Sequence, residues 1–428
     1  MNYKIQRRLF NICAFISLIK FRIYDKASDK TRERIRSRKL HKLVSKAYEI
    51  PFYRKRFEGA GVTPDDIRTI EDLVKLPLLT KDEYREWVES ELSKEDNKGL
   101  MVMQTSGSSG KPLKVINTPF EYARDVASVL RSWMFCGANP FFLKTLTEND
   151  ESSETVGYKT LIQKLGILRR EMIDEDDKEE NIISFINNYK PDIIRFYKSE
   201  MVRVAVYAEK NNLKLHKPQY FVVLGENVDY LSERLLRRNY GEGLINMYGC
   251  VEAGIIGVKR PGNGYYDLFE DAVAVNVYNE SEELAEKGRL IMTTLYKNKY
   301  PLINYDLKDL VEIEQTAKGR IIKEIQGRLD DSIVYNDGDS TGWIRIWHIA
   351  CKQEDLLQIH VIQDSLTHIV IQCVKRKDSL KKETDIETEL RTDLDIEIKG
   401  RLEVSFEWKD SIPPDSNGKL KLIEKRFN

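Results

Sequence analysis

An eight-residue loop constrains the fold of this chain more than any other stretch. Residues 105–112 read Thr-Ser-Gly-Ser-Ser-Gly-Lys-Pro and so bring four hydroxyl groups, two glycines and a lysine together. Glycines allow sharp turns that aim successive backbone N–H groups at one anion, while the hydroxyls and the ammonium of Lys111 add donors and positive charge. The pattern predicts a phosphate-binding turn between two short strands, 101–104 and 113–116. A flexible Ser/Gly turn is the alternative.

The spacing excludes a Walker A loop. That pattern requires a glycine where Thr105 stands and a Ser or Thr where Pro112 stands. Proline also pushes Lys111 toward extended geometry, so a helix does not run straight out of the loop. A phosphate-loop NTPase or kinase therefore remains only as a competing class, one that would release ADP and phosphate.

The loop resembles the T-S-G-[ST]-[ST]-G-x-P signature of the adenylate-forming enzymes, the superfamily of acyl-CoA synthetases, peptide-synthetase adenylation domains and luciferases. Four further signatures of that superfamily follow in the expected order. They are residues 248–252 (Y-G-C-V-E, similar to Y-G-x-[TS]-E), 301–309 (P-L-I-N-Y-D-L-K-D, similar to P-x-I-R-Y-x-x-G-D), 327–331 (G-R-L-D-D, similar to G-R-x-D-D) and 413–419 (P-P-D-S-N-G-K, similar to P-x-x-x-x-G-K). Five matches in order identify the superfamily far better than one.

Two early segments resemble one branch of that superfamily, the phenylacetate–CoA ligases and capsule-biosynthesis proteins. They read Ile-Pro-Phe-Tyr-Arg at 50–54 and Leu-Pro-Leu-Leu-Thr-Lys at 76–81. The resemblance covers residues 40–428. It implies an α/β, multi-domain adenylate-forming fold, with a large N-terminal ATP- and acid-binding domain over 1–327 and a small, mobile α+β lid over 328–428.

The spacing of apolar residues along the sequence agrees with this division into two domains. The first hundred residues read as mainly helical, and the region 180–260 alternates helices with short apolar strands, which predicts a parallel sheet with ligands at the strand ends. Beyond 265 the pattern is mostly β, and 332–428 reads as a compact α+β unit. The 428 residues, 41% apolar, are enough for two or three structural units.

Charge and cysteine usage narrow the function classes. Sixty-nine basic residues balance 69 acidic ones, so no overall field favours nucleic acid. The five cysteines and five histidines are scattered and contain no C-x-x-C pair, which disfavours structural zinc and a histidine triad and predicts a reducing, cytoplasmic location.

The resemblance implies a nucleotide site that takes ATP and Mg²⁺. Its phosphate loop comprises Thr105, Ser106, Gly107, Ser108, Ser109, Gly110 and Lys111. Other nucleotide-binding positions are Gly225, Glu226, Tyr248, Gly249, Asp309 and Arg328. Tyr248 would stack on adenine, and Asp309 would accept hydrogen bonds from the ribose hydroxyls.

The same resemblance implies the catalytic groups. Glu252 and Thr105 would hold Mg²⁺ between phosphate oxygens, and Lys419 would stabilise charge on the carboxylate and the α-phosphate, with Lys421 as its rival. Asp330 matches the pivot about which the lid turns. Tyr197, Asn227, Met247 and Gly254 are candidate walls of the acid pocket.

Three positions depart from the family pattern. Val251 replaces a hydroxyl residue, Asn304 replaces arginine and Lys308 replaces glycine. They leave open a non-catalytic descendant that serves polysaccharide assembly. For an active enzyme the acceptor is either a thiol, giving a coenzyme A ester, or an amine or hydroxyl on a sugar.

The N-terminus forms a separate question. Leu9 to Ile19 is apolar except at Asn11 and Ser17, yet it is too short to cross a bilayer, which takes about 20 residues. The favoured expectation is a helix packed on the protein. A basic amphipathic helix that brings residues 1–28 onto a membrane surface is the alternative.

Overall fold

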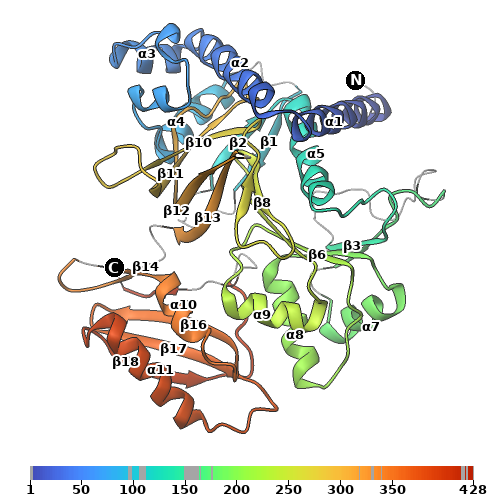
Figure 1. The fold of residues 1–428 in the computed structure, drawn as a ribbon, viewed down its shortest axis with the longest axis vertical. Coiled ribbons are helices and arrows are strands. Elements are labelled where there is room, and N and C mark those ends of the chain that lie inside the picture. Colours follow the sequence, from blue (N-terminus) through green and yellow to red (C-terminus); the bar gives the residue numbers. More distant parts are fainter. Residues whose placement is uncertain are drawn as a thin grey trace. The chain divides into compact units, whose positions relative to one another are not determined.

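The computed structural model describes residues 3–94, 99–105, 112–148, 163, 165–174, 177–317, 319–328, 332–338, 340–415, 420 and 423–427. The chain packs as two compact units, described here one at a time (Figure 1). Unit 1 comprises Met1–Phe135, Met247–Lys259 and Asn263–Ile325, and unit 2 comprises Cys136–Asn246, Arg260–Gly262 and Gln326–Asn428. The predicted division at residue 328 stays a prediction. Both units mix helices and strands, which confirms the α/β class.

The N-terminal part of unit 1 is helical, as its sequence predicts. Its elements are α1 (Tyr3–Asp25), α2 (Asp29–Tyr48), α3 (Pro51–Gly59), the 3₁₀ turns Pro64–Asp66 and Glu71–Lys75, α4 (Lys81–Leu92) and α5 (Pro119–Phe135). Helix α4 begins at a capping box, in which Thr80 Oγ1 accepts from the Glu83 N–H while the Glu83 carboxylate accepts from the Thr80 N–H. No helix in the described ranges is both long enough and apolar enough to span a membrane.

Unit 1 also carries two groups of strands. The hairpin β1 (Met101–Gln104) and β2 (Lys114–Asn117) flanks the predicted phosphate loop. The larger group has the order β10-β11-β12-β13-β9-β8-β7. Its bounds are β7 (Leu244–Cys250, beginning in unit 2), β8 (Gly254–Lys259), β9 (Tyr266–Leu268), β10 (Val273–Tyr278), β11 (Lys287–Thr294), β12 (Tyr305–Thr316) and β13 (Gly319–Arg328, ending in unit 2). These β-rich residues confirm the pattern predicted beyond 265.

Three distant motifs meet beside β12. The buried Tyr53 hydroxyl donates to the Pro301 carbonyl at 2.6 Å, and the Leu79 N–H donates to the Asn304 carbonyl at 2.8 Å. The N–H of Asp306 then donates back to Leu79 at 3.0 Å. The helical N-terminus thereby fixes the start of the strand that carries Asp309.

The first part of unit 2 is a parallel α/β layer. Strands β4, β3, β5 and β6 lie in that order, and each neighbouring pair is parallel. Its elements are β3 (Thr145–Glu148), β4 (Arg170–Ile173), α7 (Glu179–Tyr189), β5 (Ile193–Arg195), α8 (Lys198–Lys210), β6 (Tyr220–Leu224) and α9 (Tyr230–Tyr240). Fully buried strand residues such as Ile194, Phe221 and Val223 pack on helix residues such as Val204 and Leu236. The parallel sheet predicted from the alternating pattern is confirmed.

The C-terminal part of unit 2 is a four-stranded sheet with the order β18-β17-β16-β19, accompanied by helices (Figure 1). Its elements are β14 (Ser332–Val334), β15 (Ser340–Gly342), α10 (Trp343–Ala350), β16 (Leu356–Ser365), β17 (His368–Lys375), α11 (Glu383–Ile398), β18 (Glu403–Trp408) and β19 (Ile423–Lys425). Leu357, Val374 and Ile412 join the hydrophobic core of the α8–α9 layer, and Arg234 of α9 donates to the carbonyls of Cys351 and Gln353. The two parts of unit 2 thus share this core, and the C-terminal part has a second core that includes Trp347, Val361 and Leu390.

Candidate functional site

Thr105 closes the base of the predicted phosphate loop. Its backbone N–H donates to the Leu113 carbonyl, and its hydroxyl accepts from the Leu113 N–H, both at 2.9 Å. These two contacts extend the β1–β2 ladder by one pair and orient the Thr105 side chain. Residues 106–111 lie outside the described residues.

The β7–β8 hairpin brings two signatures together within unit 1. The Tyr248 hydroxyl donates to Oδ2 of Asp309 at 2.5 Å, although the two residues are 61 positions apart. The Tyr248 ring also meets the Tyr266 ring edge-on, with 6.2 Å between centroids. The structure therefore places the residue expected to stack on adenine beside the residue expected to hold ribose.

Glu252 lies in the turn between β7 and β8 and is buried. The Tyr305 hydroxyl faces its Oε1 at 3.4 Å, and burial beside this carboxylate raises the pKa of Tyr305. Sequence reasoning missed Tyr305. Its position inside the 301–309 signature was the available signal.

The two glycines of this hairpin have a backbone role. A Cβ on Gly249 would lie 2.4 Å from the Gly254 carbonyl oxygen, which no side chain tolerates. Gly254 adopts φ +65°, and a Cβ there would lie 3.0 Å from Oδ1 of Asp125 in α5. The close approach that Gly249 permits here is to the opposite strand of its own hairpin, and its role in nucleotide binding stays a prediction.

Several titratable groups surround this hairpin. Burial raises the pKa of the Cys250 thiol and that of the Asp125 carboxyl, and burial lowers the pKa of the Lys297 ammonium. The Tyr296 hydroxyl contacts both Asp125 Oδ1, at 2.5 Å, and the Ala253 carbonyl, at 3.0 Å. Cys250 is therefore a poor nucleophile, because the thiolate is the reactive form.

The departures Asn304 and Lys308 both lie where the backbone is left-handed, with φ of +55° and +62°. Asn304 is buried and donates from Nδ2 to the Leu76 carbonyl at 2.8 Å, so asparagine serves a structural role there. The Lys308 N–H donates to Asp306 Oδ1 at 2.9 Å within strand β12, where the pairing with β11 is irregular. Because glycine adopts this conformation without strain, the glycine of the family pattern has a conformational explanation.

In unit 2, Glu226 follows strand β6 and is held by protein groups. Its Oε1 accepts from the Ser199 hydroxyl at 2.8 Å and from the Ser199 N–H at 3.1 Å. Its Oε2 accepts from the Leu420 N–H at 3.3 Å. The carboxylate therefore connects the end of β6 to α8 and to Leu420.

The neighbouring candidates in unit 2 lie around the same strand end. Gly225 has φ +83°, and a Cβ there would meet the Tyr197 ring at 3.4 Å. The Tyr197 N–H donates to Glu148 Oε1 at 2.7 Å. The buried Nδ2 of Asn227 has no hydrogen-bond partner in the described part of the chain, and the place of Asn227 in the acid pocket stays a prediction.

The remaining predicted site residues either belong to one of the two units or lie outside the described residues. Met247 is buried within β7, and Arg328 ends β13 with an exposed side chain. Asp330 and Lys419 lie outside the described residues, as does the rival Lys421. The structure describes the others in two groups: Thr105, Met247, Tyr248, Gly249, Glu252, Gly254 and Asp309 in unit 1, and Tyr197, Gly225, Glu226, Asn227 and Arg328 in unit 2.

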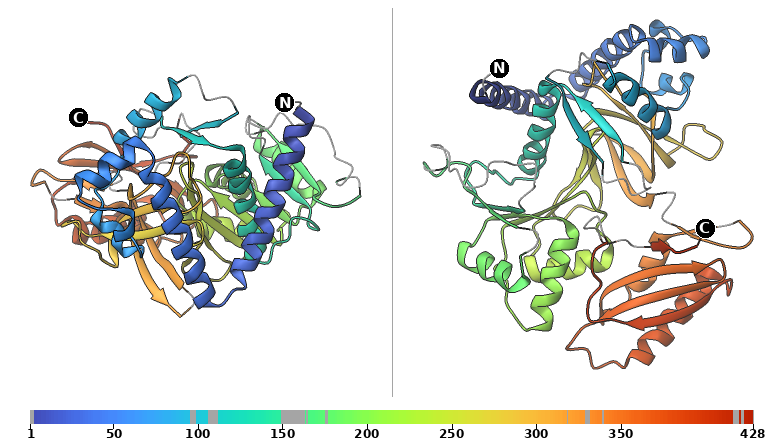
Figure 2. Two further views of the ribbon diagram at one scale, coloured as in Figure 1. Left: turned by 90° about the horizontal axis from the view of Figure 1, so that it is seen from above. Right: turned by 180° about the vertical axis from the view of Figure 1, so that it is seen from behind.

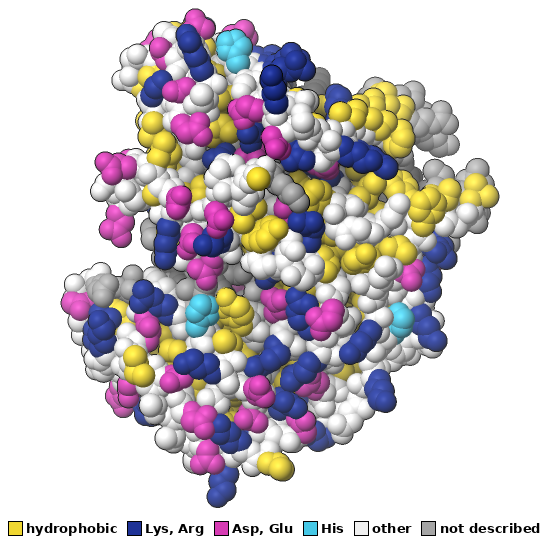
Figure 3. Space-filling model, viewed as in Figure 1, with side chains coloured by type: hydrophobic (Ala, Val, Ile, Leu, Met, Phe, Trp, Pro, Cys, Tyr) yellow, Lys and Arg dark blue, Asp and Glu magenta, His cyan; other side chains and the backbone are white. Residues whose placement is uncertain are grey.

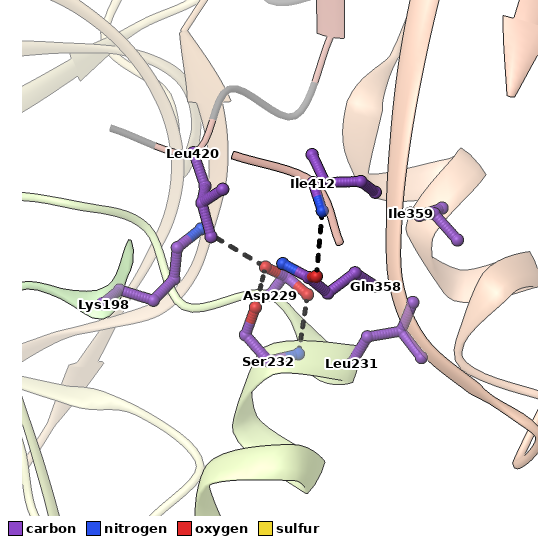
Figure 4. Close-up of a pocket in the computed structure, with 8 residues that line it drawn as sticks. All are labelled: Lys198, Asp229, Leu231, Ser232, Gln358, Ile359, Ile412 and Leu420. Atoms are coloured by element: carbon purple, nitrogen blue, oxygen red, sulfur yellow. Dashed lines mark hydrogen bonds and ion pairs between the residues drawn. The ribbon is translucent and has the colours of Figure 1, made fainter. Parts of the chain in front are cut away.

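A small cavity of about 20 Å³ lies in unit 2 near Glu226 (Figure 4). Lys198 faces Asp229 across it at 3.4 Å, and Asp229 accepts from the Ser232 N–H and hydroxyl. Ile412 and Leu420 cover it from the C-terminal part, and the Ile412 N–H donates to Gln358 Oε1 at 3.3 Å. Its volume suits about one water molecule, so it is too small for a substrate.

The candidate site residues of unit 1 could bind Mg²⁺ only together with the phosphates of the substrate. Among the described residues no three His, Cys, Asp or Glu side chains cluster closely enough to enclose a metal. Magnesium that arrives with ATP needs only one or two protein carboxylates, and the buried Glu252 would be one candidate.

Sequence comparison finds relatives of similar length. The chain is 25% identical over 358 residues to the phenylacetate-coenzyme A ligase of Aromatoleum evansii, covering 79% of this chain and 80% of that protein. It is 24% identical over 378 residues to protein CapK of Staphylococcus aureus, covering 83% and 80%. These relatives confirm the resemblance to the adenylate-forming superfamily and to its phenylacetate–CoA ligase-like branch that the signatures predict. No protein-family model matches the chain.

Solved structures agree with this adenylate-forming fold. The 2-hydroxyisobutyryl-CoA ligase in the postadenylation state, in complex with 2-HIB-AMP, superposes with a TM-score of 0.77 at 15% identity, covering 94% of this chain and 91% of that one. The amide bond synthetase McbA from Marinactinospora thermotolerans gives 0.53 at 15%, covering 75% and 69%. At 15% identity these structures show the fold alone, while the curated phenylacetate-coenzyme A ligase relatives support an acid-activating ligase.

Proposed function

We propose that this enzyme activates a carboxylic acid with ATP and transfers the acyl group to a second substrate. The observation that carries the proposal is the meeting of two signatures in unit 1, where the Tyr248 hydroxyl contacts the Asp309 carboxylate and Glu252 lies in the adjacent turn. An aromatic ring, a carboxylate and a second, buried carboxylate suit a purine, a ribose and a phosphate-bound Mg²⁺ in that order.

The first half-reaction joins two anions. An oxygen of the substrate carboxylate attacks the α-phosphorus of ATP, a phosphorus–oxygen bond forms, and the bond to the β-phosphate bridging oxygen breaks, releasing pyrophosphate. The protein must offset negative charge and hold the groups in line. We assign this task to Lys419, to the loop 105–111 and to Glu252, which acts through the Mg²⁺ of the substrate.

The second half-reaction consumes the acyl-adenylate. A nucleophile attacks the acyl carbon, and AMP leaves with the electron pair of the carbon–oxygen bond. A thiol acceptor, such as coenzyme A, is supported by the phenylacetate-coenzyme A ligase relatives. A sugar amine or hydroxyl in surface polysaccharide synthesis is supported by the likeness to CapK.

The decisive experiment measures pyrophosphate release with ATP, Mg²⁺ and a panel of aryl, fatty, hydroxy and amino acids, with hydroxylamine as a trap. Release with one acid class, abolished by Lys419→Ala while ATP binding is kept, is the expected result. Adding coenzyme A or amino sugars in place of hydroxylamine then identifies the acceptor. Absence of both release and ATP binding would favour a non-catalytic role in polysaccharide assembly, which the departure at Val251 suggests.

A further inference from the structure

Helix α1 is apolar on two opposite faces. The inner face packs on α5, where Phe21 and Tyr24 are buried and the Phe10 ring lies 5.7 Å from the Tyr122 ring. Asp25, at the end of α1, forms an ion pair with the buried Arg131 of α5. The favoured expectation that this helix packs on the protein is thus confirmed, and Figure 2 shows α1 and α5 as neighbours from two further directions.

The outer face of α1 is an exposed apolar stripe. It consists of Leu9, Ile12, Phe15, Ile16, Ile19 and Ile23, which are between 40 and 61% exposed. Five of the six are spaced alternately three and four residues apart, which puts them on one side of a helix. Figure 3 shows a band of hydrophobic side chains where α1 lies in the view of Figure 1.

Basic residues border this stripe. Lys20 follows Ile19 and Arg22 precedes Ile23, so their exposed side chains lie on opposite edges of the stripe. Residues 1–48 hold 14 Lys and Arg against three Asp and Glu, whereas the chain as a whole holds 69 of each. Arg36 and Lys39 of α2 are matched by Glu270 and Asp271, but the sequence of α1 itself has five basic residues and one acidic residue. The positive charge is therefore concentrated where the apolar stripe is.

We propose that α1 docks on an anionic lipid surface, with the stripe inserted at the level of the headgroups and the flanking cations facing the lipid phosphates. Apolar side chains between basic edges are the pattern of a helix that lies in the membrane interface. The helix does not span the bilayer, because its inner face is committed to α5.

The charge pattern favours lipid over a second copy of this chain. In a two-fold dimer the same patch meets itself, so the Lys20 and Arg22 edges of both copies would come together with equal sign. The sequence of α1 offers only Asp25 to offset them, and Asp25 is already paired with Arg131. An anionic surface neutralises both edges at once.

The test uses the full chain with sedimenting vesicles of phosphatidylcholine, prepared with and without phosphatidylglycerol. We expect binding to the anionic vesicles, weakened by added salt as charge attraction is screened. The triple variant Ile12→Ser, Phe15→Ser, Ile23→Ser should lose at least about tenfold in partitioning, because full burial of even one such side chain can exceed a tenfold factor. Reversal of the edge charges by Lys20→Glu with Arg22→Glu should abolish the preference for anionic lipid.

The matched control replaces three exposed apolar residues of the C-terminal part, in the variant Leu366→Ser, Leu380→Ser, Ile396→Ser. It should bind vesicles like the unaltered protein. Equal binding by the stripe variant, or no binding by the unaltered protein, overturns the proposal. A concentration-dependent dimer that the stripe variant abolishes, without vesicle binding, would assign the stripe to a second copy and overturn it too. Thermal melting confirms that each variant is folded.

Discussion

Asp309 in unit 1 and Glu226 in unit 2 are both predicted to bind nucleotide, yet they are held in different ways. The Asp309 carboxylate accepts a hydrogen bond from the Tyr248 hydroxyl. Glu226 uses both oxygens on protein donors, two of which are backbone N–H groups. A hydroxyl can rotate away to make room for a ligand, whereas an N–H at a fixed chain position cannot.

This difference distinguishes a carboxylate that contacts a side-chain hydroxyl from one that holds backbone N–H groups of two chain segments. Glu252 resembles Asp309 in this respect, since the group that faces its carboxylate is again a hydroxyl, that of Tyr305. Glu226 belongs with Asp229, which holds the Ser232 N–H and hydroxyl nearby. The following changes test the distinction.

The largest effect is expected from Glu252→Gln. Loss of the charge that offsets Mg²⁺ should lower kcat for pyrophosphate release by about 10²- to 10³-fold, comparable to removal of one preorganised electrostatic group. Steady-state kinetics over a range of Mg²⁺ concentrations measures it. Tyr305→Phe is the matched control, because it removes only the hydroxyl and should cost less than tenfold. Unchanged kcat in Glu252→Gln would remove this residue from the proposed mechanism.

Asp309→Asn should act mainly on ATP. A hydrogen bond to a charged group contributes roughly 1.5–3 kcal/mol, so KM for ATP should rise about 10- to 100-fold. Tyr248→Phe keeps the ring and removes the contact with Asp309, and should change KM severalfold at most. A melting-temperature loss with unaltered KM would instead show that Asp309 only anchors Tyr248.

Glu226→Gln should behave in the opposite way. Its amide NH₂ cannot accept a hydrogen bond, so a partner N–H of Ser199 or Leu420 loses its acceptor, at a cost of about 1–3 kcal/mol in unfolding free energy. KM for ATP should stay unchanged. Denaturant unfolding measures the loss of stability, and steady-state kinetics measures KM for ATP. Ser199→Ala is the control and should have a smaller effect on stability. A raised KM at full stability would restore the role that the sequence predicted for Glu226.

The smallest effect concerns Lys308. Its left-handed φ of +62° should be relieved in Lys308→Gly, which we expect to stabilise the protein by up to about 1 kcal/mol. Lys287→Gly, in strand β11, is the control and should destabilise it by a similar amount. Chemical unfolding measures both. Destabilisation by Lys308→Gly would mean that the Lys308 side chain contributes more than its backbone strain costs.

Much of the fold could be predicted because local pattern and tertiary structure agree. The capping box at Thr80, the strand at 220–224 and the parallel layer around it follow from residues close in sequence. The family resemblance assigned Tyr248 and Asp309 to one nucleotide site, but their hydrogen bond is seen only in the structure.

Other features required the structure. Nothing local indicates that Tyr53 reaches Pro301 or that Asn304 reaches Leu76, because such contacts depend on how distant elements pack. An apolar pattern marks Leu357 and Ile412 as core residues but does not say that their core is shared with α8 and α9. Because burial depends on how distant elements pack, the sequence could not show that the second apolar face of α1 is exposed.

The missing side chain at Gly254 has a consequence for protein engineering. Behind it lie the Asp125 carboxyl and the Tyr296 hydroxyl, both within 3.5 Å of where a Cβ would stand. A side chain at Gly254 would combine backbone strain with a close approach to Asp125, and one at Gly249 would collide with the hairpin backbone. For the acid-pocket wall that the sequence predicts at Gly254, a library should therefore keep both glycines and vary Asp125 in helix α5, which leaves the hairpin that carries Glu252 unchanged.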